Sequence, residues 1–402
     1  MNFDTGSTGF MLIATSLVML MTPGLAFFYG GLVSRKGVLT IMMQSFVSLG
    51  ITTIVWFTLG YSLCFSGDVF GIIGNLDMAF LNGVTLEQSL SPTNNIPLIV
   101  FIAYQMMFAV ITPALITGAF ADRVKFKAYI IFLIAFLFLV YFPFTHMVWG
   151  GGLLSDWGVV DFAGGIVVHT SAGMAALASV FFVGRRKSES NIPHSIPLIA
   201  LGTALLWFGW YGFNAGSELR VDGITAIAFL NTDIAASFAA IVWLILEYRH
   251  TGKPKFVGFL TGAVAGLATI TPAAGYVSMP VAALIGISAG IICFYAVGLK
   301  NKLNWDDALD VWGVHGVGGI TGVVMLAIFA NPAINGVAGL IHGGTSFFFI
   351  EVAAVIFAAT YAFFISFGLL KLINKFTPVI VDEEDQIIGL DRTIHDENAY
   401  LF

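Results

Sequence analysis

Apolar runs long enough to cross a lipid bilayer recur along the whole chain, at about one for every 25 to 40 residues. Each run offers the roughly 20 helical residues that a hydrocarbon core about 30 Å thick requires. Of the 402 residues, 58% are hydrophobic and 10% are charged, whereas soluble domains carry roughly 25% charged residues. The runs exclude a soluble globule and predict an all-α polytopic membrane protein.

The runs predict eleven transmembrane helices, bounded by charged residues or by clusters of glycine and proline. Sixteen of the 17 lysine and arginine residues then lie on one face, and Arg220 alone lies on the other. By the positive-inside rule the cation-rich face is cytoplasmic. The N-terminus is therefore expected outside, and a tail of residues 377–402 is expected inside, attached to a transmembrane domain of residues 1–376. The predicted spans are 8–33, 39–65, 97–121, 128–147, 162–184, 195–215, 224–247, 256–273, 280–299, 308–330 and 344–372.

The polar residues exclude further classes of protein. The net charge is −6 and the cations are scattered, which leaves no basic face that could follow a nucleic acid. Cys64 and Cys293 lie inside apolar runs, which excludes a disulfide framework and a cysteine metal cluster. The seven acidic residues of the tail fit either a solubilising polymer or a docking element. We predict no enzymatic activity, no metal and no cofactor.

Two segments of the chain look alike. DFAGGIVVH, at residues 161–169, opens the fifth span, and DVWGVH, at residues 310–315, lies near the start of the tenth. Five spans separate the two segments, so their helices cross the membrane in opposite directions, as in an inverted-topology duplication. The predicted halves cover about residues 8–184 and 195–330, with the eleventh helix, 344–372, outside the repeat.

Helical rise places two histidines near the middle of the bilayer. His169 follows Asp161, at the outer end of its helix, by eight residues, and His315 follows Asp307, at the inner end of its own, by eight. At 1.5 Å per residue each lies roughly 12 Å inside its own face, so both approach the midplane of a core about 30 Å thick. Two interpretations stay open: histidines that only satisfy each other in a packed bundle, and a functional pair, which intramembrane ionisable residues favour.

An ordered series of polar and aromatic residues leads from the outer face toward the histidines. Trp149 and Ser217 are expected at outer helix ends, Tyr104 and Phe108 run inward along the third span, and Phe213 lies four residues inward of Ser217. An aromatic face attracts a small cation by about 0.5 to 2 kcal/mol, and a hydroxyl adds a directional hydrogen bond. The series suits an ammonium or alkylammonium ion. The competing interpretation is an interfacial belt, in which Trp and Tyr lie at headgroup level.

Seven runs of the sequence resemble the ammonium transporter family (Amt/Mep/Rh), on its Amt branch. The similarity covers nearly the whole chain in order, down to GLDRTIHDENAY in the tail, and His169 places the chain with the twin-histidine members. The runs are TPGLAFFYGGLV (22–33), HMVWGGG (146–152), DFAGGIVVHTSAG (161–173), GWYGFNAGS (209–217), NTDIAAS (231–237), TPAAGYV (271–277) and DVWGVHGVGG (310–319).

The resemblance implies a homotrimer of eleven-helix subunits in the plasma membrane, each with one narrow pore, and a PII-type regulatory protein as a cytoplasmic partner. Matched positions imply an outer ammonium recruitment site at Trp149, Phe108 and Ser217, and a phenylalanine gate of Phe108 with Phe213. The other implied assignments are His169 and His315 as pore histidines, Asp161 as a supporting acid, and Tyr104 and Trp210 as vestibule or pore-lining residues.

Physical chemistry predicts that the nitrogen crosses as ammonia. Moving an isolated charge into a dry pore costs tens of kcal/mol before relaxation, and desolvation lowers the pKa of amines by up to about 3 to 5 units. An ammonium ion that passes the aromatic site is therefore driven to release its proton. Two neutral imidazoles can hydrogen-bond ammonia and carry that proton. Whether the proton crosses or returns outside stays open.

Two other functional classes compete with transport. The first is an ammonium sensor that signals through its cytoplasmic tail. The second is an intramembrane metalloenzyme, which is disfavoured because the chain offers no third convergent ligand beside two histidines and an acid.

Several polar residues stay outside these assignments. Glu351 lies inside the last apolar run and is interpreted either as a residue at the membrane–water interface or as a contact between subunits. His146 and His342 are expected at the membrane–water interface. Asp396 occupies a tail position where the family is expected to have glycine. Aspartate tolerates a left-handed backbone less readily than glycine, so the tail turn is expected to be less secure than the pore.

Overall fold

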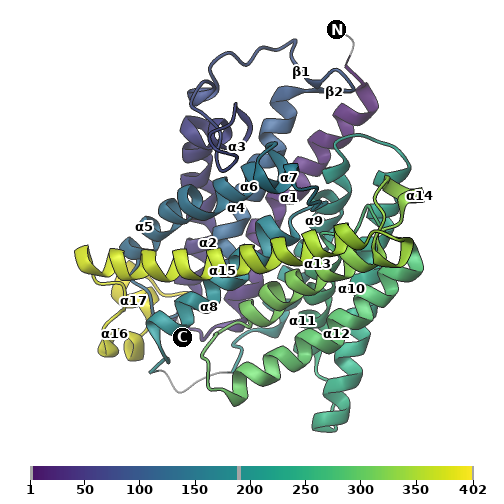
Figure 1. The fold of residues 1–402 in the computed structure, drawn as a ribbon. Helices are drawn as coiled ribbons and strands as arrows, with labels where there is room; N and C mark the ends of the chain where they lie inside the picture. Colours follow the sequence, from purple (N-terminus) through teal and green to yellow (C-terminus); the bar gives the residue numbers. More distant parts are fainter. Residues whose placement is uncertain (1–2, 188–191, 401–402) are drawn as a thin grey trace.

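The protein is a bundle of long helices joined by loops, and helix α15 lies across the others (Figure 1). This computed structural model describes residues 3–187 and 192–400. Within these residues, ten helical stretches have the length and composition to cross a membrane, and α11 is a shorter apolar helix. All eleven predicted spans fall on these helices, so the prediction of a polytopic helical membrane protein is confirmed.

Several of the long helices contain a short π-helical segment, which the sequence did not predict. In the first half the elements are α1 (Thr5–Leu32), α2 (Val38–Val55) with η1 (Trp56–Gly60) and α3 (Tyr61–Phe65), α4 (Leu98–Ile116), α5 (Phe126–Phe136) with η3 (Leu137–Tyr141), α6 (Phe142–Trp149) and α7 (Leu153–Asp156), and η4 (Gly165–Thr170) with α8 (Ser171–Val183). In the second half they are α9 (Ile196–Ala215) with the 3-10 helix η5 (Gly216–Glu218), α10 (Gly223–Thr251), α11 (Phe256–Ile270), α12 (Met279–Lys302), and η6 (Trp312–Gly316) with α13 (Val317–Phe329), followed by α15 (Thr345–Phe376). The π-helical segments are η1, η3, η4 and η6.

The remaining elements are short and lie in the loops and the tail. They are η2 (Ala79–Leu81), the antiparallel strands β1 (Ser89–Ser91) and β2 (Asn94–Pro97), α14 (Pro332–Asn335), η7 (Leu340–His342), α16 (Glu383–Ile388) and α17 (Leu390–His395).

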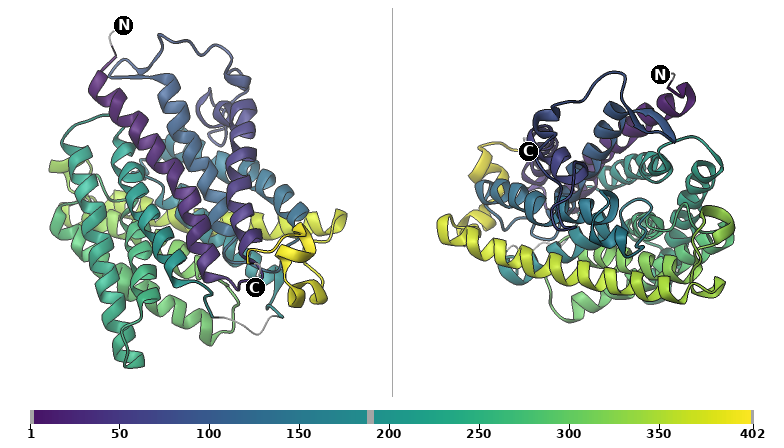
Figure 2. Two further views of the ribbon diagram at one scale, coloured as in Figure 1. Left: turned by 180° about the vertical axis from the view of Figure 1, so that it is seen from behind. Right: turned by 45° about the horizontal axis from the view of Figure 1, so that its top comes forward.

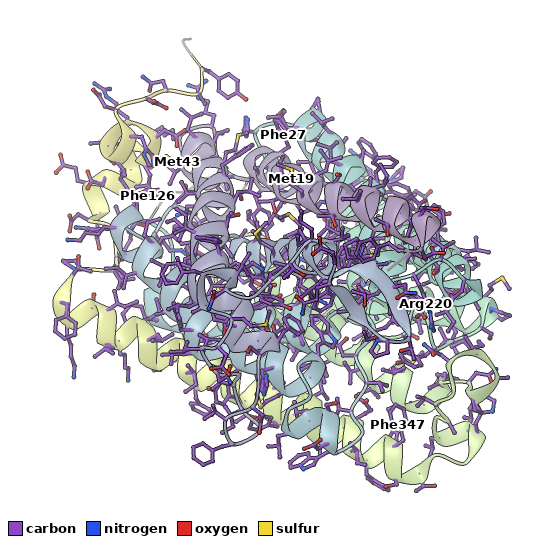
Figure 3. All side chains as sticks on the ribbon, turned by 90° about the horizontal axis from the view of Figure 1, so that it is seen from above. Met19, Phe27, Met43, Phe126, Arg220 and Phe347 are labelled. Atoms are coloured by element: carbon purple, nitrogen blue, oxygen red, sulfur yellow. The ribbon has the colours of Figure 1, made fainter. Side chains whose placement is uncertain are left out.

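Large apolar side chains cover the outside of the bundle, as a lipid environment requires. Met19 and Met43, 43% and 40% exposed, lie on the outer surface in the view from above (Figure 3). Ile13 and Phe364, on α1 and α15, are more exposed still. Since lipid tails are as apolar as these side chains, their exposure carries no penalty in a bilayer.

Glycines allow the first helices of the two halves, α1 and α9, to pack closely. A Cβ atom at Gly202 would lie 2.2 Å from the backbone nitrogen of Phe28, and one at Gly31 would lie 2.7 Å from that of Ile199. Such contacts require a residue without a side chain, as in the small-residue interfaces of membrane helices. They hold the two halves against each other beside the candidate site.

The tail folds against the loops at the cation-rich end of the bundle (Figure 2). Ile380 forms a β-bridge with Val124, and the Asp391 carboxylate accepts hydrogen bonds from the backbone and the hydroxyl of Thr40, both at 2.8 Å. Asp396 ends α17 with a φ of 53°, in the left-handed region. The described part of the tail is therefore docked rather than extended.

Candidate functional site

The two histidines meet where their helices cross in backbone contact. A Cβ atom at Gly173 would lie 2.1 Å from the backbone nitrogen of Gly316, so α8, which continues η4, and the π-helix η6 approach as closely as two backbones can. The Nδ1 atoms of His169 and His315 lie 3.2 Å apart, and both side chains are buried. One Nδ1 must donate and the other must accept, so at least the accepting ring is neutral, and two neutral rings can share this hydrogen bond.

An aspartate holds the start of each histidine-bearing helix. The Asp161 carboxylate accepts four backbone N–H groups, from residues 164–167, at 2.7 to 3.2 Å. The Asp307 carboxylate accepts the backbone N–H groups of Val311 (3.1 Å) and Trp312 (2.8 Å). A carboxylate is favoured at a helix N-terminus because these groups lack intrahelical partners.

This geometry corrects the alignment of the two repeats. The motif similarity set Asp161 beside Asp310, but Asp310 pairs with Lys300 Nζ at 2.7 Å. The functional counterpart of Asp161 is Asp307, which precedes its histidine by the same eight residues. The matching spacing was visible in the sequence, but the motif letters favoured the wrong aspartate.

Two phenylalanines cover the outer side of His169. The rings of Phe108 and Phe213 are stacked, with centroids 4.2 Å apart and planes at 24°. Phe213 lies 6.0 Å from the His169 ring, and the indole of Trp210 stacks on that ring at 5.5 Å. Any route from the outer face to the histidines along this line is closed by the stacked pair.

Trp149 and Ser217 lie beyond the stacked rings. The Trp149 indole stands at 89° to the Phe108 ring, 5.9 Å away, and its Nε1 donates to the carbonyl oxygen of Asp161 at 2.8 Å. Ser217 Oγ donates to the carbonyl of Phe213 at 2.9 Å and lies 3.3 Å from the Tyr104 hydroxyl, which leaves at least one of its lone pairs available as an acceptor. The structure thus brings Trp149, Phe108, Phe213 and Ser217 into one cluster.

The two other predicted residues, Tyr104 and Trp210, are buried and hold helix ends. Tyr104 is fully buried, and its hydroxyl lies 2.8 Å from the carbonyl oxygens of both Gly212 and Phe213. Trp210 Nε1 donates to Thr271 Oγ1 at 2.9 Å, which fixes the indole plane against His169. Tyr104 therefore braces the end of α9 from behind the phenylalanines.

Cavities continue from the histidines to the cation-rich face. A void of about 10 Å³ touches both imidazoles and Phe213, and about this volume holds one water-sized molecule. A second cavity of about 180 Å³ extends from His315 to Asp310, and it shares Phe28, Val264 and His315 with the first. Leu32, Ala308 and Asp310 line both this second cavity and a polar pocket of about 1040 Å³.

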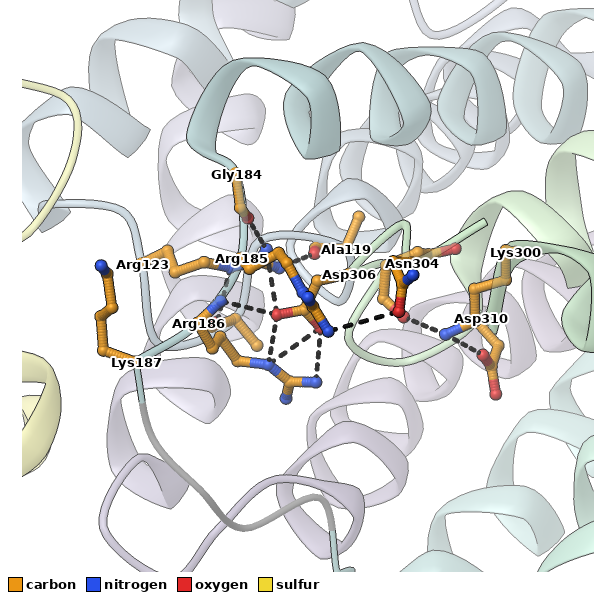
Figure 4. Close-up of polar contacts among 12 residues, drawn as sticks. Ala119, Arg123, Gly184, Arg185, Arg186, Lys187, Lys300, Asn304, Asp306 and Asp310 are labelled. Atoms are coloured by element: carbon orange, nitrogen blue, oxygen red, sulfur yellow. Dashed lines mark hydrogen bonds and ion pairs between the residues drawn. The ribbon is translucent and has the colours of Figure 1, made fainter. Parts of the chain in front are cut away.

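A charged cluster ties the loops around that polar pocket together (Figure 4). Asp306 accepts from Arg186 Nη2 at 2.7 Å and lies 3.6 Å from Arg123 Nη1. Burial alone would raise the pKa of Asp306, but its bonds to Arg186 and the two positive charges lower it to about 2. Asp307 is more deeply buried, and this burial raises its pKa to about 6, although the positive charge of Lys300 acts to lower it. None of these charged residues was among the site residues expected from the sequence.

The side chains of His146 and Glu351 are both buried within the subunit. His146 is fully buried, with Nδ1 2.9 Å from the Cys64 carbonyl and Nε2 2.9 Å from Oδ1 of the exposed loop residue Asp68. Glu351 is also fully buried and accepts the backbone N–H of Val160. Each residue therefore has a polar partner within its own subunit.

Comparison with known proteins places this geometry in context. Residues 9–400 match the model of the Ammonium Transporter Family. A putative ammonium transporter of Methanothermobacter thermautotrophicus is 45% identical over 405 residues, which cover 100% of this chain and 99% of that protein.

Solved structures show the same fold. The crystal structure of Candida albicans Mep2 superposes with a TM-score of 0.89 at 35% identity, over 95% of this chain and 88% of that one. A structure described as a sensor Amt protein superposes with a TM-score of 0.89 at 31% identity, over 97% and 98%.

Proposed function

The chain belongs to the ammonium transporter family, and from that premise we propose that it recruits ammonium at Trp149, Phe108 and Ser217, strips its proton beside Phe213, and conducts ammonia past His169 and His315. The observation that carries the proposal is the contact of the two buried imidazoles beneath a closed pair of phenyl rings. Each step follows from the chemistry of the groups along this line.

Recruitment rests on groups that prefer a small cation with N–H donors. The Trp149 and Phe108 rings lie 5.9 Å apart and perpendicular to each other, and an aromatic face attracts a cation by about 0.5 to 2 kcal/mol. The Ser217 oxygen, whose proton is used by the Phe213 carbonyl, accepts an N–H from the ion. Potassium gains the π contact but has no N–H to donate.

Deprotonation follows from the size and dryness of the space beyond the rings. The void at the imidazoles, about 10 Å³, admits one molecule of about the size of water and no hydration shell. An intact ion would lose its solvation there without a counter-charge, at a cost of tens of kcal/mol before relaxation. The proton is therefore given up, either to water on the outer side of the rings or to an imidazole of the pair. Ammonia is neutral and fits the same space.

The shared hydrogen bond gives the two histidines complementary roles. The ring that donates from Nδ1 has a bare Nε2 that accepts, and the ring that accepts at Nδ1 carries its proton on Nε2 and donates. His169 Nε2 is buried without a partner among residues 3–187 and 192–400. The pair therefore offers ammonia one acceptor for an N–H and one donor for its lone pair.

The test is the response of reconstituted protein to ammonium pulses, read as current and with a pH-sensitive dye inside the liposome. His169→Ala and His315→Ala are each expected to abolish the response, and His250→Ala, on the exposed end of α10, is the matched control. Potassium pulses should give no current. If the proton crosses with the ammonia, the pulse produces current with little change of internal pH. If the proton returns outside, the ammonia takes up a proton inside, so the dye reports a rise of internal pH without current. An unchanged response in both pore variants would remove the pair from the mechanism.

We also propose a homotrimer in the plasma membrane that is regulated at its tail. The docked tail lies at the cation-rich end of the bundle, beside Lys125 and Lys187, which pair with Asp382 and Glu383. This surface is where a cytoplasmic regulator of the PII type would reach the pore exit. Native mass spectrometry of the purified protein, with and without such a regulator, measures both the trimer and the complex.

A further inference from the structure

A buried carboxylate from α15, the last of the eleven predicted spans, reaches into the outer end of the candidate pathway. Glu351 Oε1 accepts the backbone N–H of Val160 at 2.6 Å, and the side chain is 0% exposed. Its second oxygen, Oε2, has no hydrogen-bond partner in the part of the chain that the structure describes. Glu351 is the one acidic residue in the sequence of α15, a helix of 32 residues that lies outside the inverted repeat.

The backbone that Glu351 holds is the segment on which the outer site is built. Val160 directly precedes Asp161, whose carbonyl oxygen accepts from Trp149 Nε1 and whose carboxylate caps the helix that carries His169. On the other side of Asp161, the N–H of Phe162 bonds to the Pro272 carbonyl at 3.2 Å. The segment is thus fixed on both sides of Asp161.

We propose that Glu351 is a positioning residue for ammonium recruitment: through Val160 it fixes the Asp161 carbonyl that aims the Trp149 indole, and the carboxylate that starts the His169 helix. This inference rests on the proposed function. It gives α15, which contributes no residue to the two cavities beside the histidines, a part in the affinity for ammonium.

The free-energy cost of burying the Glu351 carboxylate indicates a role for this residue beyond packing. An isolated buried polar group is destabilising unless it is fully hydrogen-bonded, and only one of the two Glu351 carboxylate oxygens has a partner among the residues that the structure describes. A leucine in this place would pack α15 against η4 and α8, its neighbours, without that penalty. What leucine cannot do is accept the N–H of Val160.

The experiment measures the half-saturating ammonium concentration and the maximal response in liposomes for Glu351→Leu, Glu351→Gln and Ser366→Ala. Glu351→Leu leaves Val160 unpaired, so the half-saturating concentration should rise roughly fivefold to tenfold, as expected for one lost hydrogen bond. Glu351→Gln keeps the accepting oxygen and should restore it to within about twofold of the parent protein. Ser366, buried on the same helix with a hydroxyl that has no partner in the described residues, is the matched control.

The outcomes separate this inference from its premise. If the parent protein gives no ammonium response, the proposed function fails. If Glu351→Leu lowers only the yield or the maximal response and leaves the half-saturating concentration unchanged, Glu351 is merely structural and the inference is wrong. It is equally wrong if Glu351→Gln shows the same weakened affinity as Glu351→Leu, or if Ser366→Ala shifts the affinity as much.

Discussion

The two helix-capping aspartates allow a graded test of how the pathway is held together. Asp161 accepts four backbone N–H groups, two on each carboxylate oxygen, whereas Asp307 accepts two, one on each. Replacement by asparagine keeps one accepting oxygen and turns the other into a donor. Asp161→Asn therefore strands two N–H groups and Asp307→Asn strands one.

The expected magnitudes follow from the number of stranded groups. A buried donor without a partner costs about 1 to 3 kcal/mol, which gives ~2 to 6 kcal/mol for Asp161→Asn and ~1 to 3 kcal/mol for Asp307→Asn. The loss at Asp161 should thus be about twice that at Asp307. Asp307→Asn also removes a charge opposite Lys300, so its value represents an upper bound for a single stranded group.

Thermal unfolding of both variants in detergent, followed by the fluorescence of the eight tryptophans, provides the comparison. Asp161→Glu is the control, because it keeps the negative charge but changes the length of the side chain that carries the carboxylate. The reasoning is refuted if Asp161→Asn unfolds at the same temperature as the parent protein, or if Asp307→Asn is the less stable of the two variants. Either result would show that the carboxylates do not hold the helix starts.

Four further predictions concern the gate, the tail and the charged cluster. Phe213→Ala removes one ring of the 4.2 Å stack and should admit a potassium current that the parent protein lacks; continued exclusion of potassium in flux measurements would contradict a gating role. Asp396→Gly relieves the left-handed φ of 53° and should stabilise the docked tail by about 0.5 to 1 kcal/mol, seen as slower proteolysis of the tail. Asp391→Ala removes the acceptor of the Thr40 backbone and hydroxyl and should speed that cleavage, with a loss of about 1 kcal/mol. The pKa of Asp306 is lowered from 3.8 to about 2, so its contribution to stability is fully present above pH 3.8 and is lost as the pH falls toward 2; Asp306→Asn should flatten this decline in a pH series of unfolding temperatures.

Much of the fold could be predicted because hydrophobic length is a property of the sequence itself. A run of about 20 apolar residues has few structures available in lipid other than a helix, so the eleven spans could be placed before any coordinates. The predicted depth of His169 and His315 assumed eight helical residues after each aspartate, but η4 and η6 begin only at Gly165 and Trp312. The order of the aromatic residues along their helices could be read from the sequence.

The tertiary structure alone decided which side chains meet. Depth does not specify the angle around a helix axis, and a helix that is apolar on all sides gives no periodic signal for that angle. Four π-helical segments shift these angles further, because each adds a residue to a turn. The spacing to the histidine pointed to Asp307 and the motif letters pointed to Asp310, and only the capping contacts decided that Asp307 is the counterpart of Asp161. The sequence offered no means to predict that Glu351 turns inward to Val160. The two histidines meet where Gly173 and Gly316 let helix backbones touch, and only the packed bundle fixes where that happens.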